Sequence, residues 1–413
     1  MSVRRLLATA GFLAVVAGCS AGSSVAPIPS VPLSSLTLLP GADTLLVGGG
    51  ASFTVVAVDT HSVVVANPVL TWSSSNSAVF HVSNTGAVTA VGEGSATLSV
   101  SSGGKTAAAN LLVLPTQRGW FTQPSNVLED LSSVFFTADG NHGWAVGAAG
   151  KIVATSNAGT SWVTQPSSVS NTLTSVWFTS STEGWVTGGG GRILHTTNQG
   201  AVWAVVASGT TDNLNGITFA TPDTGWAVGA NGSILRTVNH GATWTRLMPG
   251  ITAVTLRSVS FAGTRDGWAV GDNGTIIGTH DRGLTWFVVQ PSVTSLTLYG
   301  VARSSIASTH AVGTGGATPR TTVTPDSVAW EIRNAGALNE LRAVAFTDAQ
   351  HGWAVGRNGT SLVLVTTDGG VTWNSQATSP AALLTGVHFI DGLRGWAVGE
   401  NGTVLHTVTG GTP

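Results

Sequence analysis

The chain has 413 residues, of which 9% are charged, and its formal net charge is −2. This length exceeds that of one ordinary domain and predicts two or more. Soluble domains carry about 25% charged residues on average, and proteins that bind nucleic acids usually show a basic patch or stripe. The composition therefore argues against a nucleic-acid partner.

The first nineteen residues have the pattern of an export signal. Arg4 and Arg5 precede an apolar run over residues 6–17, which is too short to span a bilayer comfortably. The run ends in Val16-Ala17-Gly18-Cys19, which resembles the lipobox of bacterial lipoproteins. In that family the signal is cut before the cysteine, which then carries lipid. We therefore expect lipidation at Cys19 and attachment to the outer membrane or the outer face of the plasma membrane; the alternative is a soluble secreted protein.

Residues 20–30 are rich in Ser, Ala, Gly and Pro and predict a flexible tether. The next segment, residues 31–115, contains short runs that partly alternate apolar and polar residues, such as 52–58 and 96–100. Such runs are typical of half-buried strands, and their spacing predicts a β-sandwich.

This first domain also has a family resemblance. Trp72-Ser73-Ser74-Ser75-Asn76, with the segments 82–90 and 92–97, resembles the group 2 bacterial immunoglobulin-like domains. The resemblance implies a spacer or an adhesive module on a cell surface. We expect a stalk, with adhesion as the alternative.

The rest of the chain is organised around a repeated Gly-Trp-Ala-Val-Gly segment. The tryptophan, or the histidine that replaces it once, recurs at steps of 41 to 43 residues. The marker residues are Trp144, Trp185, Trp226, Trp268, His310, Trp353 and Trp396. A fixed period of this size indicates a propeller or another repeat array.

Each repeat unit predicts four short strands. It reads Leu-x-x-Val-x-Phe, Gly-Trp-Ala-Val-Gly, Gly-x-Ile-Leu-x-Thr and then a turn that ends in Trp, which is the content of one propeller blade. Asn-Gly pairs such as Asn231-Gly232 lie between the second and third strands. Asn-Gly favours a type I′ hairpin with positive φ, so these two strands should be antiparallel neighbours.

The turn before the final tryptophan matches the Asp-box, Ser/Thr-x-Asp-x-Gly-x-Thr-Trp. The match is full at residues 279–286 and 366–373, which contain Asp281 and Asp368. Asparagine takes the aspartate's place in three other units, at Asn157, Asn198 and Asn239. Because an Asx side chain can hydrogen-bond the backbone of its own turn, we interpret the motif as a turn clamp and not as a catalytic carboxylate.

The final tryptophans indicate how the array closes. There are seven: Trp120, Trp162, Trp203, Trp244, Trp286, Trp330 and Trp373. The last unit lacks one, while Arg118-Gly119-Trp120-Phe121 stands alone before the first unit. We predict that this N-terminal strand completes the last blade of a seven-bladed propeller over residues 117–413, because closure removes exposed sheet edges. The predicted fold class is therefore all-β, an immunoglobulin-like sandwich followed by a propeller.

As a whole, the repeat resembles the photosystem II stability/assembly factor family and its bacterial relatives, within the wider group of Asp-box propellers. The three repeated elements quoted above carry this resemblance in most units. It implies an assembly chaperone that binds membrane-protein partners without catalysing a reaction. The lipoprotein signal and the immunoglobulin-like stalk depart from the photosynthetic members, so a photosynthetic role is kept as an alternative.

Positions that vary between units are candidates for specificity. After the first Leu of each unit come Ser132, Thr174, Asn215, Arg257, Tyr299, Arg342 and Thr385. In the hairpin between the second and third strands the variable residues are Ala148, Gly189, Ala230, Asp272, Thr314, Arg357 and Glu400. We expect both sets on one face, where the long side chains edge the mouth of the central channel. The predicted ligand- or peptide-binding patch consists of Arg257, Tyr299, Arg342, Asp272, Arg357 and Glu400.

Arginines in such a patch can hold a carboxylate through paired hydrogen bonds; the alternative is a set of solvated loop ends. An enzyme is a second hypothesis, because sialidases share the Asp-box and use an arginine cluster with a tyrosine nucleophile. Tyr299 would then need a nearby carboxylate, and the repeat alignment offers Asp272. The array shows neither a matched carboxylate pair nor an Arg-Ile-Pro-like start motif, and it has seven units instead of six. We expect no catalysis and assign no catalytic residue.

The ten histidines do not form a metal-binding pattern. His195 and His406 share one position in non-adjacent units, as do His142 and His351, so we expect structural or surface histidines and neither metal nor cofactor. The predicted protein is an exported, lipid-anchored monomer that binds a protein or a glycan at the cell envelope.

Overall fold

The computed structural model describes residues 32–114, 118–247, 250–290, 292–303, 308–324, 327–336, 339–379 and 381–412. The predicted signal with Cys19 and the predicted tether, residues 20–30, lie outside the described residues. The chain divides into two compact units, Met1–Leu114 and Pro115–Pro413. Strands dominate the described part of both units, which is all-β as predicted. No helix in that part is long and apolar enough to cross a membrane.

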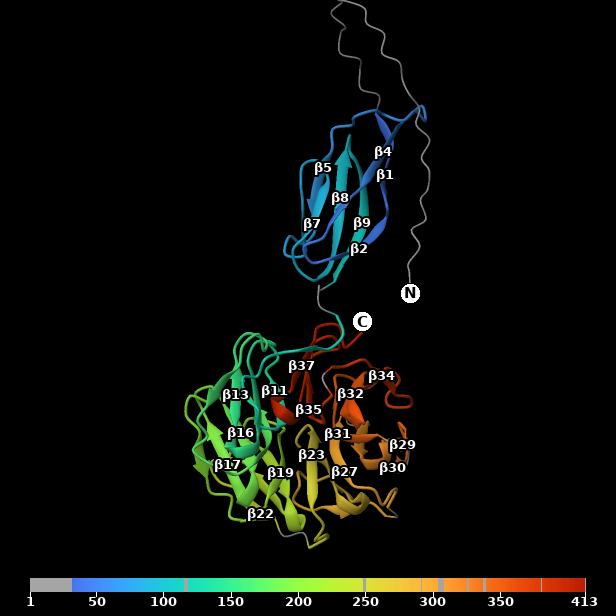
Figure 1. Ribbon diagram of the computed structural model, residues 1–413. Coiled ribbons are helices and arrows are strands. Elements are labelled where there is room, and N and C mark those ends of the chain that lie inside the picture. The colour runs from blue at the N-terminus through green and yellow to red at the C-terminus, as the bar shows by residue number, and fades with distance from the viewer. Residues whose placement is uncertain are drawn as a thin grey trace, which may run out of the picture. The chain divides into compact units, whose positions relative to one another are not determined.

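The described residues of the first unit form three sheets (Figure 1). In the first sheet, β1 (Leu33–Leu39) pairs with β4 (Thr54–Asp59). The second has the order β2 (Ala42–Leu46), β9 (Lys105–Leu114), β8 (Gly94–Ser102), β5 (Thr71–Ser74). The third has the order β3 (Gly50–Ser52), β7 (Ala87–Ala90), β6 (Phe80–Val82).

One hydrophobic core holds the first unit together. Leu98 and Val100 of β8 and Phe80 of β6 are fully buried, as the alternating pattern of an amphipathic strand requires. The half-buried Trp72 packs against this core. Gly86 lies under its ring, because a Cβ there would come within 2.5 Å of the indole.

The described residues of the second unit form seven four-stranded sheets, numbered here in chain order. Sheet 1 has β11 (Leu131–Phe136), β12 (Gly143–Gly147), β13 (Ile152–Thr155), β14 (Val163–Gln165). Sheet 2 has β15 (Leu173–Phe178), β16 (Gly184–Gly188), β17 (Arg192–Thr196), β18 (Ala204–Val206). Sheet 3 has β19 (Leu214–Phe219), β20 (Gly225–Gly229), β21 (Ile234–Thr237), β22 (Thr245–Leu247).

The remaining four sheets follow the same plan. Sheet 4 has β23 (Leu256–Ala262), β24 (Asp266–Gly271), β25 (Ile276–Thr279), β26 (Phe287–Val288). Sheet 5 has β27 (Leu298–Arg303), β28 (Thr309–Gly313), β29 (Arg320–Thr324), β30 (Ser327–Glu331). Sheet 6 has β31 (Glu340–Phe346), β32 (Gly352–Asn358), β33 (Thr360–Thr366), β34 (Asn374–Gln376). Sheet 7 has β35 (Leu384–Phe389), β36 (Gly395–Gly399), β37 (Val404–Thr407) and, as its fourth strand, β10 (Phe121–Thr122).

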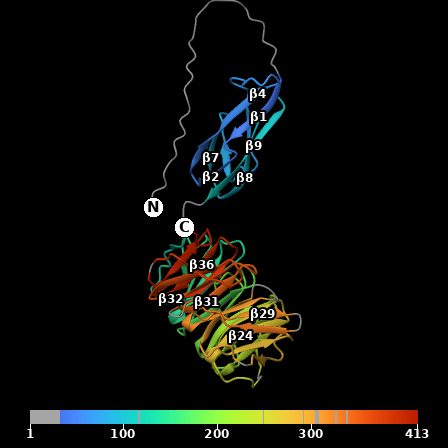
Figure 2. The ribbon, with the colours of Figure 1, turned by 90° about the vertical axis from the view of Figure 1, so that its right-hand side faces the viewer.

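The sheets surround a common axis, with the first strand of each sheet innermost (Figure 1). Figure 2 shows the same sheets after a turn of 90°. Each first strand contacts the first strands of both neighbouring sheets, and β35 contacts β11, so the ring is continuous. The second unit is a β-propeller. The predicted N-terminal strand closes it: Phe121 pairs with His406 and Thr122 pairs with Leu405.

Aromatic stacking joins neighbouring sheets. The Trp of a Gly-Trp-Ala-Val-Gly segment lies on the Phe at or near the end of the next sheet's first strand; Trp144 and Phe178, for example, have ring centroids 3.5 Å apart. The final tryptophan of that next sheet, here Trp203, contacts the same Phe by its edge. Such pairs contribute about 0.5–1.5 kcal/mol beyond the area they bury. Between sheets 5 and 6, His310 replaces the tryptophan and stacks on Phe346 at 3.9 Å. Sheet 4 differs, because sheet 5 has Arg303 at the position of the Phe and Trp268 contacts Trp330 by its edge.

Two kinds of turn recur in the sheets of the propeller. Between the second and third strands lie short 3₁₀ turns: η1 (Ala148–Gly150), η2 (Gly189–Gly191), η3 (Ala230–Gly232), η4 (Asp272–Gly274), η5 (Thr314–Gly316), η6 (Glu400–Gly402). Asn231 and Gly232 both have positive φ, at 54° and 65°, as the Asn-Gly pattern predicts. Sheet 6 differs, because β32 and β33 extend until only Gly359 turns the chain.

The Asp-box is a turn clamp, as predicted. Asp281 accepts hydrogen bonds from the hydroxyl of Thr279 and from the backbone and hydroxyl of Thr285. Burial raises the pKa of Asp281, but these hydrogen bonds outweigh it and hold that pKa at about 2. The carboxylate therefore serves the turn as a charged acceptor.

Candidate functional site

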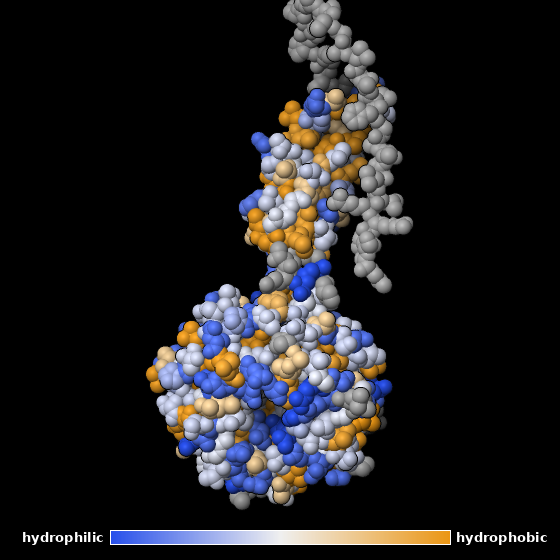
Figure 3. All heavy atoms as spheres, in the orientation of Figure 1, coloured by the Kyte–Doolittle hydropathy of each residue, from blue (hydrophilic) through white to orange (hydrophobic). Residues whose placement is uncertain are grey.

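The first strands of the seven sheets enclose a cavity of about 150 Å³. Its wall includes the variable residue after the first Leu of every unit: Ser132, Thr174, Asn215, Arg257, Tyr299, Arg342 and Thr385. Strongly hydrophilic residues gather around the centre of the propeller face in view in Figure 3. Three of the six predicted site residues, Arg257, Tyr299 and Arg342, thus line one cavity.

These three side chains stack on one another. The Tyr299 ring lies between two guanidinium groups, with the central carbon of Arg342 4.0 Å and that of Arg257 5.1 Å from its centroid. Contacts of this length are favourable cation–π interactions. Sheets 4, 5 and 6 therefore present a preorganised Arg-Tyr-Arg row to the cavity.

Asp272, Arg357 and Glu400 are not among the residues that line the cavity. Asp272 instead binds Arg257 through two hydrogen bonds, to Nε at 2.5 Å and to Nη2 at 3.1 Å. Arg357 lies 3.8 Å from Glu400, in the hairpin of the next sheet. These predicted site residues form a supporting layer of ion pairs.

One member of this layer, Glu340, is not among the site residues predicted from the sequence. It accepts hydrogen bonds from Arg342 and, at 3.3 Å, from Arg357. The sequence feature that could have predicted its role is its position, directly before the first Leu of its unit and two residues from Arg342. With Glu340 included, three arginines meet three carboxylates, so the predicted patch is charge-balanced and not simply cationic.

The variable residues of three other sheets hold neighbouring first strands together. Thr174 donates to the carbonyl of Leu214 at 2.5 Å, and Asn215 donates to that of Leu256 at 2.8 Å. Thr385 donates likewise to Leu131 across the ring closure. Each bond ties one first strand to the next. The variable residues of sheets 2, 3 and 7 therefore have a structural role, which leaves the Arg-Tyr-Arg row as the candidate site.

A second group on the first strands also escaped the sequence analysis. Phe135 of sheet 1 lies beside Trp177 of sheet 2 and His388 of sheet 7, with ring centroids 5.4 and 4.6 Å apart. Burial lowers the pKa of His388 to about 4, although the backbone of Phe136 partly offsets the shift. The sequence feature that could have predicted this group is the fifth position of the first strand, which is aromatic only in these three neighbouring units.

The histidines occupy structural positions. His195 and His406 stack on the tryptophans of their own sheets, Trp185 and Trp396, with centroids 4.8 and 4.5 Å apart. His142 and His351 pair with the carboxylates of Asp139 and Asp348. Within the described residues, no three His, Cys, Asp or Glu side chains gather as metal ligands.

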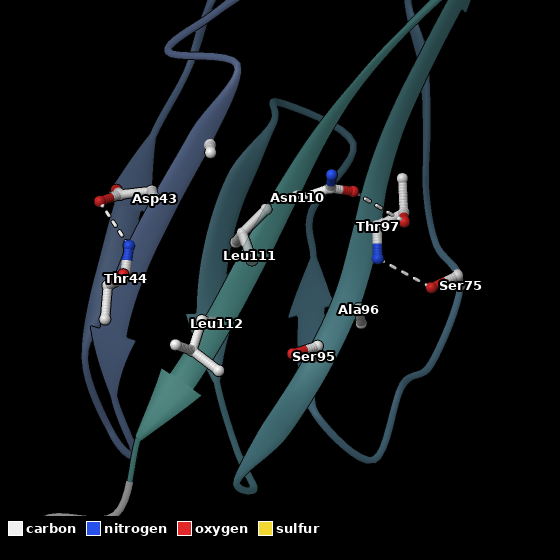
Figure 4. A pocket seen from close by; sticks show the side chains of 10 residues that line it. Asp43, Thr44, Ser75, Ser95, Ala96, Thr97, Asn110, Leu111 and Leu112 are labelled. Carbon is white, nitrogen blue, oxygen red and sulfur yellow. Dashed lines mark hydrogen bonds between the residues drawn. The ribbon is translucent and has the colours of Figure 1, made fainter.

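The first unit has a shallow groove of about 660 Å³ on its second sheet (Figure 4). Part of its polar lining is already paired, because the Thr97 backbone donates to the Ser75 hydroxyl and the Thr97 hydroxyl donates to Asn110. The groove offers no grouping comparable with the Arg-Tyr-Arg row.

Solved structures share the propeller fold. A structure described as YCF48 bound to D1 peptide superposes with a TM-score of 0.59 at 20% identity, over 71% of this chain and 96% of the other. YCF48 from Cyanidioschyzon merolae gives 0.58 at 23% identity, over 70% and 98%. The GH74 xyloglucanase from Xanthomonas campestris gives 0.57 at 14% identity, over 71% of this chain and 54% of the enzyme. At these identities the likeness concerns the fold alone.

The sequence has no match among the curated proteins. The family model described as photosynthesis system II assembly factor YCF48 matches residues 114–209, 201–296 and 322–413. These three matches cover most of the propeller and more than half of the chain. The protein therefore belongs to the family of the photosystem II assembly factor YCF48.

Proposed function

We propose that this protein is an exported, lipid-anchored binding protein of the cell envelope that acts without catalysis. In this proposal the seven sheets are the blades of one closed propeller, which binds a protein or glycan partner at the central cavity. Residues 31–115 form an immunoglobulin-like stalk, and lipid on Cys19 holds the protein at the membrane. A protein partner is favoured, because the family is described as an assembly factor and because a solved structure of similar fold is described as bound to a peptide.

The observation that carries the proposal is the Arg-Tyr-Arg row. The side chains of Arg257 and Arg342 are 35% and 28% exposed, so a ligand can reach them. A guanidinium group has five N–H donors, and Asp272 occupies only two of those on Arg257. The ion pairs fix the orientation of each guanidinium group and leave donors for an incoming carboxylate or amide oxygen.

The same geometry argues against the sialidase-like alternative. A tyrosine nucleophile needs a nearby carboxylate as its base. The two oxygens of Asp272 instead accept hydrogen bonds from Arg257, and Tyr299 lies between two cations. Asp281 and Asp368 serve their turns as acceptors. The xyloglucanase shares only the fold.

The binding proposal is tested with a triple variant, Arg257→Ala, Tyr299→Ala and Arg342→Ala, in the full chain. A double variant, Arg192→Ala and Arg333→Ala, removes two arginines that do not line the cavity and serves as the control. Envelope proteins captured by the wild type are identified, and the affinity of the purified partner is measured for all three proteins. We expect at least tenfold weaker binding for the triple variant and unchanged binding for the control.

Equal affinity for the triple variant and the wild type would move the site away from the cavity. Release of sugar from envelope glycans by the wild type, lost in Tyr299→Phe, would instead support the enzyme.

The anchoring proposal is tested by Cys19→Ala. Labelled fatty acid should enter the wild-type protein, whereas the variant should remain unlabelled and leave the membrane fraction. Equal labelling of the two proteins would refute lipidation at Cys19.

A further inference from the structure

The residue two positions after the first Leu of each repeat unit is small and lines the cavity of about 150 Å³. Little space is available there, because the first strands lie close together around the axis: a Cβ on Gly386 would lie 3.0 Å from the Cα of Ser133. The residue is serine in sheets 1, 2 and 4, at Ser133, Ser175 and Ser258, and glycine or alanine in the other four. Ala343 in sheet 6 shows that packing at this position does not require a hydroxyl group.

Each of these three serine hydroxyls accepts one hydrogen bond from the backbone of the next sheet. The donors are the N–H groups of Val176, Ile217 and Val301, each 3.3 Å from Oγ of its serine. A hydroxyl group has one O–H donor besides its lone pairs. No hydrogen bond within the described residues uses the protons of Ser133, Ser175 or Ser258, so three O–H donors remain at the cavity wall.

The two arginines of the Arg-Tyr-Arg row add charged donors to this wall. Asp272 binds Nε and Nη2 of Arg257, and Glu340 binds Nη2 of Arg342. Nη1 of each guanidinium group is therefore not used by its carboxylate. No aspartate or glutamate is among the described residues that line the cavity. Its side chains thus present donors from sheets 1, 2, 4 and 6 and no charged acceptor.

Donors that surround the axis favour a ligand whose acceptor atoms point in several directions. A carboxylate has only two oxygens, and their lone pairs lie in one plane. A phosphate group presents three acceptor oxygens around a tetrahedral centre. The cavity is large enough, since an apolar cavity of about 150 Å³ is known to bind benzene, and a phosphate ion is smaller than benzene.

We propose that the group held in this cavity is a tetrahedral oxyanion, with phosphate as its simplest form. The three serine hydroxyls and Nη1 of Arg257 and Arg342 donate to its oxygens. This inference rests on the proposed function and deepens it, because it ranks phosphate above the carboxylate or amide oxygen that the arginines alone would accept. Either the free ion or a phosphate ester carried by a larger ligand has this chemistry.

The test uses the full chain with ¹³C-labelled tyrosine, because Tyr299 is the one tyrosine of the sequence and reports on the cavity directly. Inorganic phosphate and acetate are titrated separately at constant ionic strength, and the NMR signals of the Tyr299 ring are followed. We expect saturable shifts with phosphate and at least fivefold weaker binding of acetate. Methyl phosphate forms a second arm: binding of inorganic phosphate alone indicates the free ion, whereas binding of both indicates an ester. Shifts that do not saturate with phosphate, or acetate binding as tight as that of phosphate, would overturn the proposal.

A triple variant, Ser133→Ala, Ser175→Ala and Ser258→Ala, removes the three O–H donors and places in each sheet the residue that sheet 6 already carries. Ser260→Ala is the matched control, because its hydroxyl accepts the N–H of Arg303 at 3.2 Å in the same way but does not line the cavity. The triple variant should bind phosphate at least tenfold more weakly, and the control should bind it as the wild type does. The single variant Ser175→Ala, for which we expect at least threefold weaker binding, replaces the triple variant if the latter does not fold. Wild-type phosphate affinity in a folded serine variant would overturn the proposal.

The partner assay of the proposed function separates the two conclusions. If phosphate does not bind but the partner still depends on the Arg-Tyr-Arg row, this inference fails and the proposed function stands. If phosphate binds but the partner ignores the row, the cavity recognises the oxyanion and the proposed partner site lies elsewhere.

Discussion

His310 shows how one residue changes a repeated contact. It takes the place of the repeat tryptophan and stacks on Phe346, yet an imidazole titrates and an indole does not. Burial, with a smaller contribution from Arg320, lowers the pKa of His310 to about 4. Burial and Arg394 lower the pKa of His406 to about 4 as well. Together with His388, three histidines of the propeller therefore remain neutral in the pH range in which an exposed histidine becomes charged.

This predicts a loss of stability in mild acid. The unfolded chain takes up protons as the pH falls below about 6.5, while the folded chain takes them up only near pH 4. Stability is therefore full above pH 6.5 and falls between pH 6.5 and 4, by up to about 3 kcal/mol for each histidine. Denaturant midpoints between pH 8 and 4 measure this loss. His310→Phe should reduce this pH-dependent loss of stability by about a third, because it removes one of the three buried histidines. His351→Gln changes an exposed histidine and should leave the loss unchanged. Equal pH profiles for His310→Phe and the wild type would contradict the assignment.

At the scale of the element, the Asp-box or its asparagine form gives five of the seven sheets the same turn after the third strand. The hydroxyl of Thr366 donates to Asp368, which also accepts from the backbone and hydroxyl of Thr372. Asn157 does the same in sheet 1, where its amide nitrogen reaches the hydroxyl of Ser161. Hydrogen-bonding capacity, and not charge, is therefore the shared requirement.

A pair of substitutions tests this requirement. Asp368→Asn should change the free energy of unfolding by less than about 0.5 kcal/mol, because other units already use asparagine. Asp368→Ala leaves several donors of the turn without their acceptor and should cost about 1–3 kcal/mol. Urea unfolding at pH 7 distinguishes the two. A loss as large for asparagine as for alanine would show that the charge itself is needed.

At the scale of the whole molecule, stability depends on how the ring is closed. The closing strand β10 forms only two residue pairs with β37, so side chains have to add to its attachment. The indole of Trp120 donates to Gln376 at 2.8 Å, and its ring lies 5.7 Å from that of Phe389. Gly119 donates to the carbonyl of Thr412 at 2.9 Å. These contacts join the two ends of the propeller sequence.

Trp120→Ala should therefore open the ring more readily than the same change elsewhere. A buried tryptophan replaced by alanine costs about 3–5 kcal/mol, and loss of β10 also exposes the edge of β37, which can pair with other chains. Trp162→Ala removes the equivalent residue of sheet 1, whose strands are consecutive in the chain, and serves as the control. We expect faster hydrogen exchange in β37 and concentration-dependent association for Trp120→Ala only. Identical behaviour of the two variants would argue against a closing role for β10.

Much of this architecture could be predicted because it depends on local, repeated patterns. The step of 41 to 43 residues, the turn residues and the solitary Trp120 segment indicated the four-stranded units and the closing strand before any contact was known. Periodicity and turn chemistry act over a few residues, so they can be read along the chain. Comparison of repeats also singled out Arg257, Tyr299 and Arg342 as residues that do not repeat.

Only the tertiary structure decided what these residues meet. That Glu340 also binds Arg357, that Asp272 supports Arg257, and that Phe135, Trp177 and His388 lie together all depend on side chains from different elements. The sequence by itself determined the repeating frame, since each turn and strand specifies its own conformation. The tertiary structure decided the charge balance and the cavities, since these depend on distances between residues that are far apart in the chain.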